Sequence, residues 1–428
     1  MASVYHSMSD ADLDQELAQL EAEAEALRAR NLALDMARGK PSREQTDLSK
    51  PMLDLLTGET DLTDGGIPAD NYFAPDGLPS ARALAAEIIG VDAAHVIVNG
   101  SSSLNLMHDL VAHAYALGVC GHDPWCTQGQ VKFLCPAPGY DRHFTVTAHY
   151  GIENIPVAMT PDGPDMDEVA RLVETDPQVK GIWCVPKYSN PQGCTYSDET
   201  VRRFAALKPA APDFRIFWDN AYAVHDLYDT GDELLNIFDA LAEAGAADLV
   251  YEFASTAKVT FPGSGMAWVA ASDADIADIR SHFAAMRVCP EKISQFAHVA
   301  FLRDAAGVRA HMRKHAAVIR PRFELVERKF AEGLADLGIA TWTHPRGGYF
   351  VLFNGPHGSA KAIVALAKEL GVTLTGAGAT WPYGNDPCDS DIRIAPTFPT
   401  LEELAEALDV FIVAVKLVCA RMERAARS

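Results

Sequence analysis

Short apolar runs alternate with helical patterns through the middle of the chain, and this alternation restricts the fold more than any other feature. Repeated strand–helix alternation with short apolar strands is typical of an α/β fold built on a largely parallel sheet. In such sheets, ligand sites form at the carboxyl ends of the strands. The seven expected strands are residues 95–98, 131–135, 152–156, 181–185, 215–218, 249–253 and 267–271.

The flanks of this region predict further structure, and 428 residues exceed one typical core. Apolar residues at helical spacing predict a helix over residues 9–30, which we expect to pack on another lobe or subunit. A helical region over about 292–337 leads to a C-terminal part that reads as a smaller α+β lobe. We divide the chain into an N-terminal segment joining the small domain, a large ligand-binding domain and a small domain, at 1–50, 51–310 and 311–428.

Charge and cysteine content exclude several classes of function. The chain has 36 Lys and Arg against 58 Asp and Glu, a net charge of -22, which argues against nucleic-acid and anionic-membrane partners. Eight scattered cysteines without a CxxC pair favour a reduced, cytoplasmic protein, and we expect no metal site. The first residues lack the pattern of a signal peptide. The apolar stretch at 410–420 is short and contains Lys416, so we expect a buried helix there.

The stretch from Tyr251 to Met266 places a lysine among hydroxyls and glycines just past an expected strand. Ser255 and Lys258 come first, and Pro-Gly-Ser-Gly with Ser264 follows. Such residues suit a phosphate site with an amine beside it, and a lysine in such a place can form a Schiff base. Taken alone, they are more often a solvated loop lysine between a strand and a helix.

Other expected strands also end in residues that suit a ligand. Gly100, Ser101 and Ser102 begin a helix, where free N–H groups and hydroxyls bind anions, although a helix cap would need only one serine. Tyr140 offers a flat face to a planar ligand, but alone it is more often a packed aromatic. Asp219 ends a buried strand and needs a positive or donating partner. An amine, a phosphate site, an aromatic face and an aspartate together indicate pyridoxal 5'-phosphate.

At this point the chain resembles the fold-type I, class I pyridoxal-phosphate aminotransferases over nearly its whole length. The resemblance implies a large domain with a mostly parallel seven-stranded sheet and a smaller α+β domain. The family's motifs occur in order. They match Gly39, Tyr72 with Gly77, Gly100-Ser101-Ser102, Tyr140 with His143, Asn190-Pro191-Gln192-Gly193, Asp219 with Tyr222, Ser255 with Lys258, and Arg393 in DIRIAPTF.

The chain looks most like the divergent bacterial aspartate aminotransferases. The opening helix, ARGKPS and DGGIPADNYFAPDGLPSAR carry this closer likeness. One departure is clear, since many class I enzymes have a phosphate-binding arginine eight residues after the lysine, where this chain has Met266. The phosphate would then be met by backbone N–H groups, an unidentified cation or the hydroxyls of Ser101, Ser102, Ser255 and Ser264.

The resemblance also implies roles for the cofactor-facing residues. Lys258 would form the Schiff base with pyridoxal 5'-phosphate and later move the substrate proton. Asp219 would pair with the pyridine nitrogen, with His143 behind it. Asn190 and Tyr222 would bind the ring oxygen.

Substrate and subunit contacts follow from the same likeness. Arg393 would grip the substrate α-carboxylate in a bidentate pair, and Gly39 would add a backbone donor. Tyr72 would reach the phosphate of a neighbouring subunit, so we expect a homodimer. The side-chain carboxylate of aspartate needs a second cation, for which the candidates include Arg38, Lys40 and Lys187.

The sequence therefore predicts an aminotransferase that exchanges amino groups between aspartate and 2-oxoglutarate. A lyase of the same fold, such as a C–S lyase, and an aminotransferase with another amino donor stay open, because sequence near the lysine hardly separates them. A ligand-sensing regulator would want a basic DNA-binding domain, and the acidic N-terminal helix is too short for one.

Overall fold

A mixed sheet forms the centre of the large lobe in the computed structural model, which describes residues 3–428. All seven predicted strands are present, with ends that differ by up to four residues. β11 runs antiparallel to its neighbours, the other six run parallel to one another, and the two-residue β7 adds an eighth strand at one edge. In spatial order the strands are β4 (Val96–Val98), β11 (Ala267–Ala270), β10 (Val250–Ser255), β9 (Arg215–Asp219), β8 (Val179–Cys184), β5 (Lys132–Ala137), β6 (Glu153–Thr160) and β7 (Gly163–Pro164).

Successive side chains along a strand point to opposite faces of the sheet, so both faces of a buried sheet need covering, and helices cover both here. Phe217 and Phe253 pack on one face with residues of α5, while Ile216 and Trp218 pack on the other with residues of α7 and α8. The large-lobe helices are α4 (Pro79–Ile89), α5 (Ser103–Leu117), α6 (Asp141–His149), α7 (Met166–Thr175), α8 (Asp198–Ala205), α9 (Ile237–Ala244), α10 (Asp273–Met286) and α11 (Ile293–Leu302).

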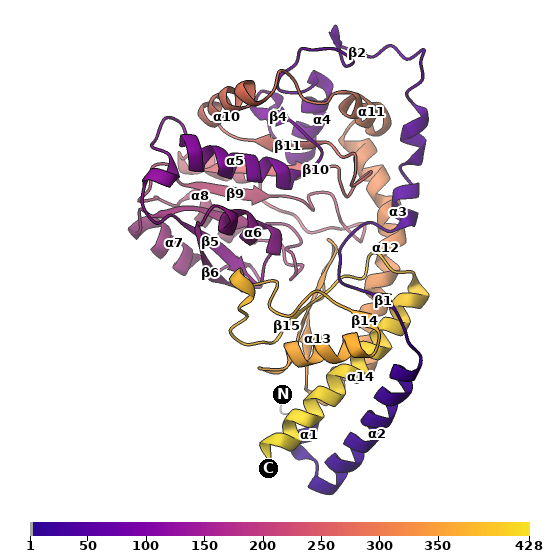
Figure 1. Cartoon of the computed structure of the whole chain (residues 1–428). Coiled ribbons are helices and arrows are strands. Elements are labelled where there is room, and N and C mark those ends of the chain that lie inside the picture. The colour runs from indigo at the N-terminus through magenta and orange to yellow at the C-terminus, as the bar shows by residue number, and fades with distance from the viewer. Residues whose placement is uncertain (1–2) are drawn as a thin grey trace.

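The C-terminal part forms the predicted smaller α+β lobe (Figure 1). An antiparallel sheet of β12 (Thr341–Trp342), β13 (Val351–Asn354) and β15 (Asp391–Ile394) packs with α13 (Ala360–Glu369) and α14 (Leu401–Ala426). The N-terminal segment joins this lobe, since β1 (Leu34–Asp35) pairs with β14 (Val372–Thr373).

The predicted N-terminal helix is α2 (Asp10–Ala29), and Ser9 caps it through a hydrogen bond from the Asp12 N–H. It packs along α14 of its own chain, as the indigo and yellow helices in Figure 1 show. Ion pairs reinforce the contact, with Glu21 2.6 Å from Arg421 and Asp14 2.7 Å from Arg424. The remaining short α-helices and strands are α1 (Val4–Ser7), α3 (Arg43–Asp47), β2 (Thr63–Asp64) and β3 (Ile67–Pro68).

One long helical region was predicted over 292–337, and the structure divides it into α11 and α12 (Ala305–Leu334). Arg303 has a φ of 69°, which is incompatible with a right-handed helix, so α11 ends before it. Asp304 then caps α12 by accepting a hydrogen bond from the Gly307 N–H at 2.7 Å. Met312 lies in a core cluster of the large lobe and Phe323 in that of the small lobe, so α12 links the two. The domain boundaries at 50 and 310 stay predictions, and residues 1 and 2 lie outside the described part.

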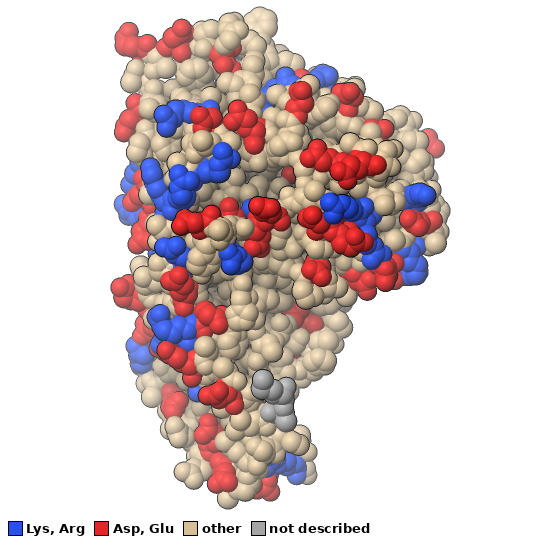
Figure 2. Space-filling model, turned by 180° about the vertical axis from the view of Figure 1, so that it is seen from behind, with Lys and Arg blue, Asp and Glu red and all other residues tan. Residues whose placement is uncertain are grey.

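Between residues 3 and 428, no helix is long and apolar enough to span a bilayer. The apolar stretch at 410–420 lies inside α14, and most of its side chains are buried against the small lobe. Seen from behind, acidic and basic side chains lie interspersed over this face of the molecule (Figure 2). In α/β folds, ligand sites form at the carboxyl ends of the strands, so we look for the functional residues there.

Candidate active site

Asp219 lies at the carboxyl end of β9, and a column of aromatic rings supports it from one side. His143 of α6 approaches it with Nε2 3.1 Å from Oδ2, and the His143 ring stacks on Trp183 at 4.5 Å and 13°. All three side chains are buried. The other carboxylate oxygen of Asp219, Oδ1, is buried and has no hydrogen-bond partner within residues 3–428. A buried acceptor without a partner is costly, so this oxygen fits a donor that a ligand would bring.

Lys258 follows β10 by a tight turn that brings its amine to the same edge of the sheet. Its Nζ lies 5.1 Å from the centroid of the Tyr222 ring. Burial lowers the pKa of the Lys258 amine, and the charge of Asp219 opposes that effect. A lysine with a lowered pKa carries more of the neutral amine that acts as a nucleophile or base.

Tyr140 and Asn190 line one small hollow together with His143, the partner of Asp219. The Tyr140 ring lies edge-on to His143, with 4.9 Å between the centroids. Burial raises the pKa of Tyr140 to about 12, and Asp219 adds to the shift. Burial likewise raises the pKa of Tyr222, with Tyr140 and Asp219 contributing. Residues from four strand ends, far apart in sequence, therefore meet in one place.

Arg393 lies in β15 of the small lobe, and its side chain is only 8% exposed. One terminal nitrogen, Nη1, donates to Asn190 at 3.3 Å, and the guanidinium lies over the Phe350 ring at 4.9 Å. Gly39 also packs against Phe350, where an added Cβ would come within 2.2 Å of the ring. Glycine is needed at this point because the N-terminal segment passes so close to Phe350.

The predicted phosphate turn lies between β4 and α5. Gly100 has a φ of 70°, in the left-handed region that favours glycine. Ser102 occupies the N-cap of α5 without making a capping hydrogen bond from its hydroxyl. Helix N–H groups and an unused hydroxyl suit an anion. Gly100, Ser101 and Ser264 line one open hollow, whereas Ser255 accepts from the Ala257 N–H at 3.4 Å.

Met266, where the arginine was expected, turns away from this hollow. The Met266 N–H donates to the Thr256 hydroxyl at 2.8 Å, and the Thr256 N–H donates to the Met266 carbonyl at 2.8 Å. This pairing directs the Met266 side chain into an apolar cluster, where it is 1% exposed. Position 266 therefore belongs to the core in this chain.

A buried polar layer behind Lys258 was missed by the sequence reasoning. Tyr349 donates to the Lys258 carbonyl at 3.5 Å and accepts from the Gln45 amide at 2.9 Å. Gln45 also contacts His315, which lies 3.1 Å from His311, and His311 reaches the Val259 carbonyl at 2.9 Å. The spacing of the two histidines on an otherwise apolar helix face was the one available signal.

Several predicted residues are exposed or make other contacts. Tyr72 is 65% exposed, on a loop whose carbonyls accept from the Lys292 amine. Lys187 is paired with Asp226 at 2.9 Å, and Lys40 lies over the Phe398 ring at 3.6 Å. Arg38 is exposed.

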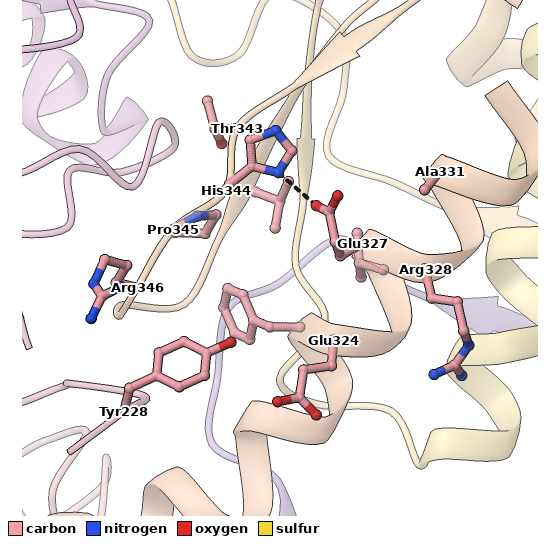
Figure 3. Close-up of a pocket in the computed structure, with 12 residues that line it drawn as sticks. Tyr228, Glu324, Glu327, Arg328, Ala331, Thr343, His344, Pro345 and Arg346 are labelled. Carbon is pink, nitrogen blue, oxygen red and sulfur yellow. Dashed lines mark hydrogen bonds and ion pairs between the residues drawn. The ribbon is translucent and has the colours of Figure 1, made fainter. Parts of the chain in front are cut away.

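A separate hollow of about 430 Å³ lies between α12 and the segment around His344 (Figure 3). In it, His344 Nδ1 lies 2.7 Å from Glu327 Oε2, and these side chains are 66% and 46% exposed. None of the predicted site residues lines it. The candidate site is therefore the strand-end cluster around Asp219 and Lys258, although the hollow beside Tyr140 and His143 is smaller than the one beside His344.

Comparisons with known proteins show the family of the chain. The aspartate amino-transferase family model matches residues 8–427. An aspartate aminotransferase from Corynebacterium glutamicum is 42% identical over 92% of this chain and 91% of its own length. A putative aminotransferase from Mycolicibacterium smegmatis is 46% identical over 90% of each chain. The crystal structure of an aspartate transaminase from C. glutamicum superposes with a TM-score of 0.95 at 39% identity, covering 99% of both chains.

The family match, the relatives and the fold define a fold-type I aminotransferase, so the enzyme acts on amino acids and 2-oxo acids. The chain belongs to the aspartate amino-transferase family. A more distant structure of the same fold, an α-aminoadipate aminotransferase from Thermus thermophilus at 21% identity and a TM-score of 0.72, is complexed with N-(5'-phosphopyridoxyl)-L-leucine.

Proposed function

We propose that this aminotransferase uses pyridoxal 5'-phosphate to exchange amino groups between aspartate and 2-oxoglutarate. The observation that carries the proposal is the buried Asp219 Oδ1, which lacks a partner at a strand end that also presents Lys258. A protonated pyridine nitrogen would satisfy that oxygen. The cofactor supplies an electron sink conjugated to the substrate nitrogen when it is bound.

The chain's own residues then have separate tasks. Asp219 holds the proton of the ring nitrogen, and His143 keeps the carboxylate in place. Tyr222 and Asn190 bind the ring oxygen. The Lys258 Nζ removes the proton from the substrate Cα, for which its lowered pKa suits it.

The phosphate is assigned to the turn before α5 and the hydroxyls near it. The N-cap hydroxyl of Ser102, free of any capping bond, supports this assignment. No arginine takes part at position 266, so several weaker donors share the phosphate charge. The proposed donors are Gly100, Ser101, Ser102, Ser255 and Ser264.

The substrate α-carboxylate is assigned to Arg393, helped by Asn190 and a backbone donor at Gly39. The shared contact of Gly39 and Arg393 with Phe350 supports a common subsite. The 42% identical aspartate aminotransferase of C. glutamicum supports aspartate as the amino donor. Arg38 and Lys40 flank Gly39 and suit the side-chain carboxylate better than Lys187, whose amine Asp226 already holds.

The proposal includes a homodimer in which Tyr72 reaches the partner's phosphate. Tyr72 and its neighbour Phe73 are both about two-thirds exposed, and Leu53 and Ile293 beside the Ser101 hollow are also exposed. Such apolar exposure favours a partner surface. A cytoplasmic location is also proposed, and the eight free cysteines support it.

The test is the variant Lys258→Ala. We expect the purified variant to lose the visible absorbance of the bound cofactor and transamination of aspartate, whereas Lys132→Ala, a distant lysine paired with Asp176, keeps both. Unchanged turnover in Lys258→Ala would overturn the proposal. A lyase of the same fold would instead release free ammonia or sulfide without a 2-oxo acid acceptor.

A further inference from the structure

The carboxylate-binding arginine of the proposed reaction already has a carboxylate on it. Asp141, the first residue of α6, places Oδ1 3.0 Å from Nη1 of Arg393. Nη1 also donates to Asn190, and Nη2 donates to the Thr375 hydroxyl at 3.3 Å. The arginine thus has a partner on each terminal nitrogen.

The guanidinium is nonetheless incompletely satisfied. Arg393 is 8% exposed, and its Nε is buried without a partner within residues 3–428. A guanidinium offers five N–H donors, and a bidentate pair with a carboxylate uses two of them in parallel along one edge. A ligand carboxylate that bound to both Nη1 and Nη2 would need the position that the Asp141 carboxylate occupies.

Asp141 is suited to giving way. Its side chain is 33% exposed while that of Arg393 is 8% exposed, so water can take over the Asp141 carboxylate when the pair separates. A buried guanidinium without a counter-charge is costly, so Asp141 also stabilises the site before substrate arrives. These two properties describe a residue that holds the arginine and then releases it.

We propose that Asp141 is a resident carboxylate on Arg393 which the substrate α-carboxylate displaces, so that Asp141 sets the affinity for every substrate that Arg393 grips. The inference rests on the proposed role of Arg393. Asp141 is a positioning residue, because it acts through the arginine. The exchange makes and breaks ion pairs only, with no covalent step.

The consequence is a defined shift in binding. Asp141→Asn keeps the size of the side chain but removes its charge, so the incoming carboxylate no longer competes with another. We expect KM for both the amino donor and the 2-oxo acid to fall by about twofold to fivefold, the strength of a partly exposed ion pair, with kcat unchanged. A residue that merely supported the fold would instead lower kcat without lowering KM.

Succinate, a dicarboxylate without an amino group, separates this inference from the proposed function. Calorimetric titration with succinate should show tighter binding to Asp141→Asn than to the wild type. The control is Asp176→Asn, at an aspartate that pairs with the distant Lys132, and this variant should bind succinate as the wild type does. Asp141→Ser serves if Asp141→Asn does not fold. These measurements need no turnover, so they stand even if aspartate proves not to be the amino donor.

A crystal structure with succinate gives the decisive geometry. We expect a carboxylate of succinate on Nη1 and Nη2 of Arg393, with the Asp141 oxygen more than 4 Å from Nη1. Succinate bound along Nε and Nη2 with the Asp141 pair intact would overturn the inference. Unchanged or weaker succinate binding in folded Asp141→Asn would overturn it as well.

Discussion

The two ends of the proposed cofactor site are built in opposite ways. At the Asp219 end, one carboxylate is fixed by one histidine, and that histidine is fixed by Trp183, all in the buried interior. At the phosphate end, Ser101 and Ser264 line an open hollow, and the position that often holds an arginine is occupied by the buried Met266. One end depends on a single well-placed group, and the other spreads its task over many.

This contrast has a physical reason. A ring nitrogen makes one hydrogen bond, so its partner has to be rigid and correctly placed. A phosphate has several oxygens, and these accept from many donors, including backbone N–H groups at the start of α5. A single substitution should therefore be severe at the Asp219 end and mild at the phosphate end.

The largest effect is expected for Asp219→Asn. The amide keeps the shape but cannot hold the proton on the ring nitrogen, so we expect kcat to fall roughly a thousandfold, within the range of a lost general acid–base contribution. Stopped-flow measurement of half-reactions gives the rate, and circular dichroism checks the fold. The exposed Asp198, in the first turn of α8, provides Asp198→Asn as the control. A loss in kcat of less than tenfold would mean that the Asp219 end does not depend on a single group.

Met266→Arg tests whether the phosphate end can accept the arginine of other family members. The side chain is directed into an apolar cluster with Trp268 and Leu78, so a charged group there has no counter-charge. We expect a loss of roughly 3 kcal/mol or more in the free energy of unfolding, by urea denaturation, and no gain in cofactor affinity. Met266→Leu should be nearly neutral. Tighter cofactor binding in a stable Met266→Arg would show that the hollow has room for the guanidinium.

The same contrast explains what the sequence could predict. Asp219, Lys258 and Gly100 follow expected strands, and the carboxyl ends of parallel strands meet at one edge, so local pattern was enough to bring them together. Asp141 pairs with Arg393, 252 residues away, Tyr349 with Lys258, 91 residues away, and Gln45 with Tyr349, 304 residues away. Contacts of that kind depend on how the two lobes pack, which local periodicity does not encode.

A smaller effect is expected from the pH dependence of stability at the rigid end. Glu252 of β10 accepts from the Asn220 amide at 2.8 Å, next to Asp219, and burial raises the pKa of Glu252 to about 7. The folded state thus holds a proton that the unfolded chain releases near pH 4.5. This stabilisation is complete below that pH and is lost as the pH rises through about 7.

Glu252→Gln carries a neutral side chain at every pH and should remove this dependence. Between pH 5 and pH 7, the wild type should lose about 2 kcal/mol of unfolding free energy relative to the variant. Urea denaturation across that range measures the difference. Parallel curves for the two proteins would mean that Glu252 does not hold its proton in the fold.

The smallest effect is expected for Ser101→Ala at the phosphate end. One hydroxyl among several donors contributes about 1 kcal/mol, so the Kd for pyridoxal 5'-phosphate should rise only about fivefold with kcat at saturating cofactor unchanged. Fluorescence titration of the cofactor-free protein measures that Kd. The double variant Ser101→Ala, Ser102→Ala should lose roughly the product of the single losses, because independent donors add in free energy. A hundredfold loss from Ser101→Ala alone would mean that this end, too, depends on a single group.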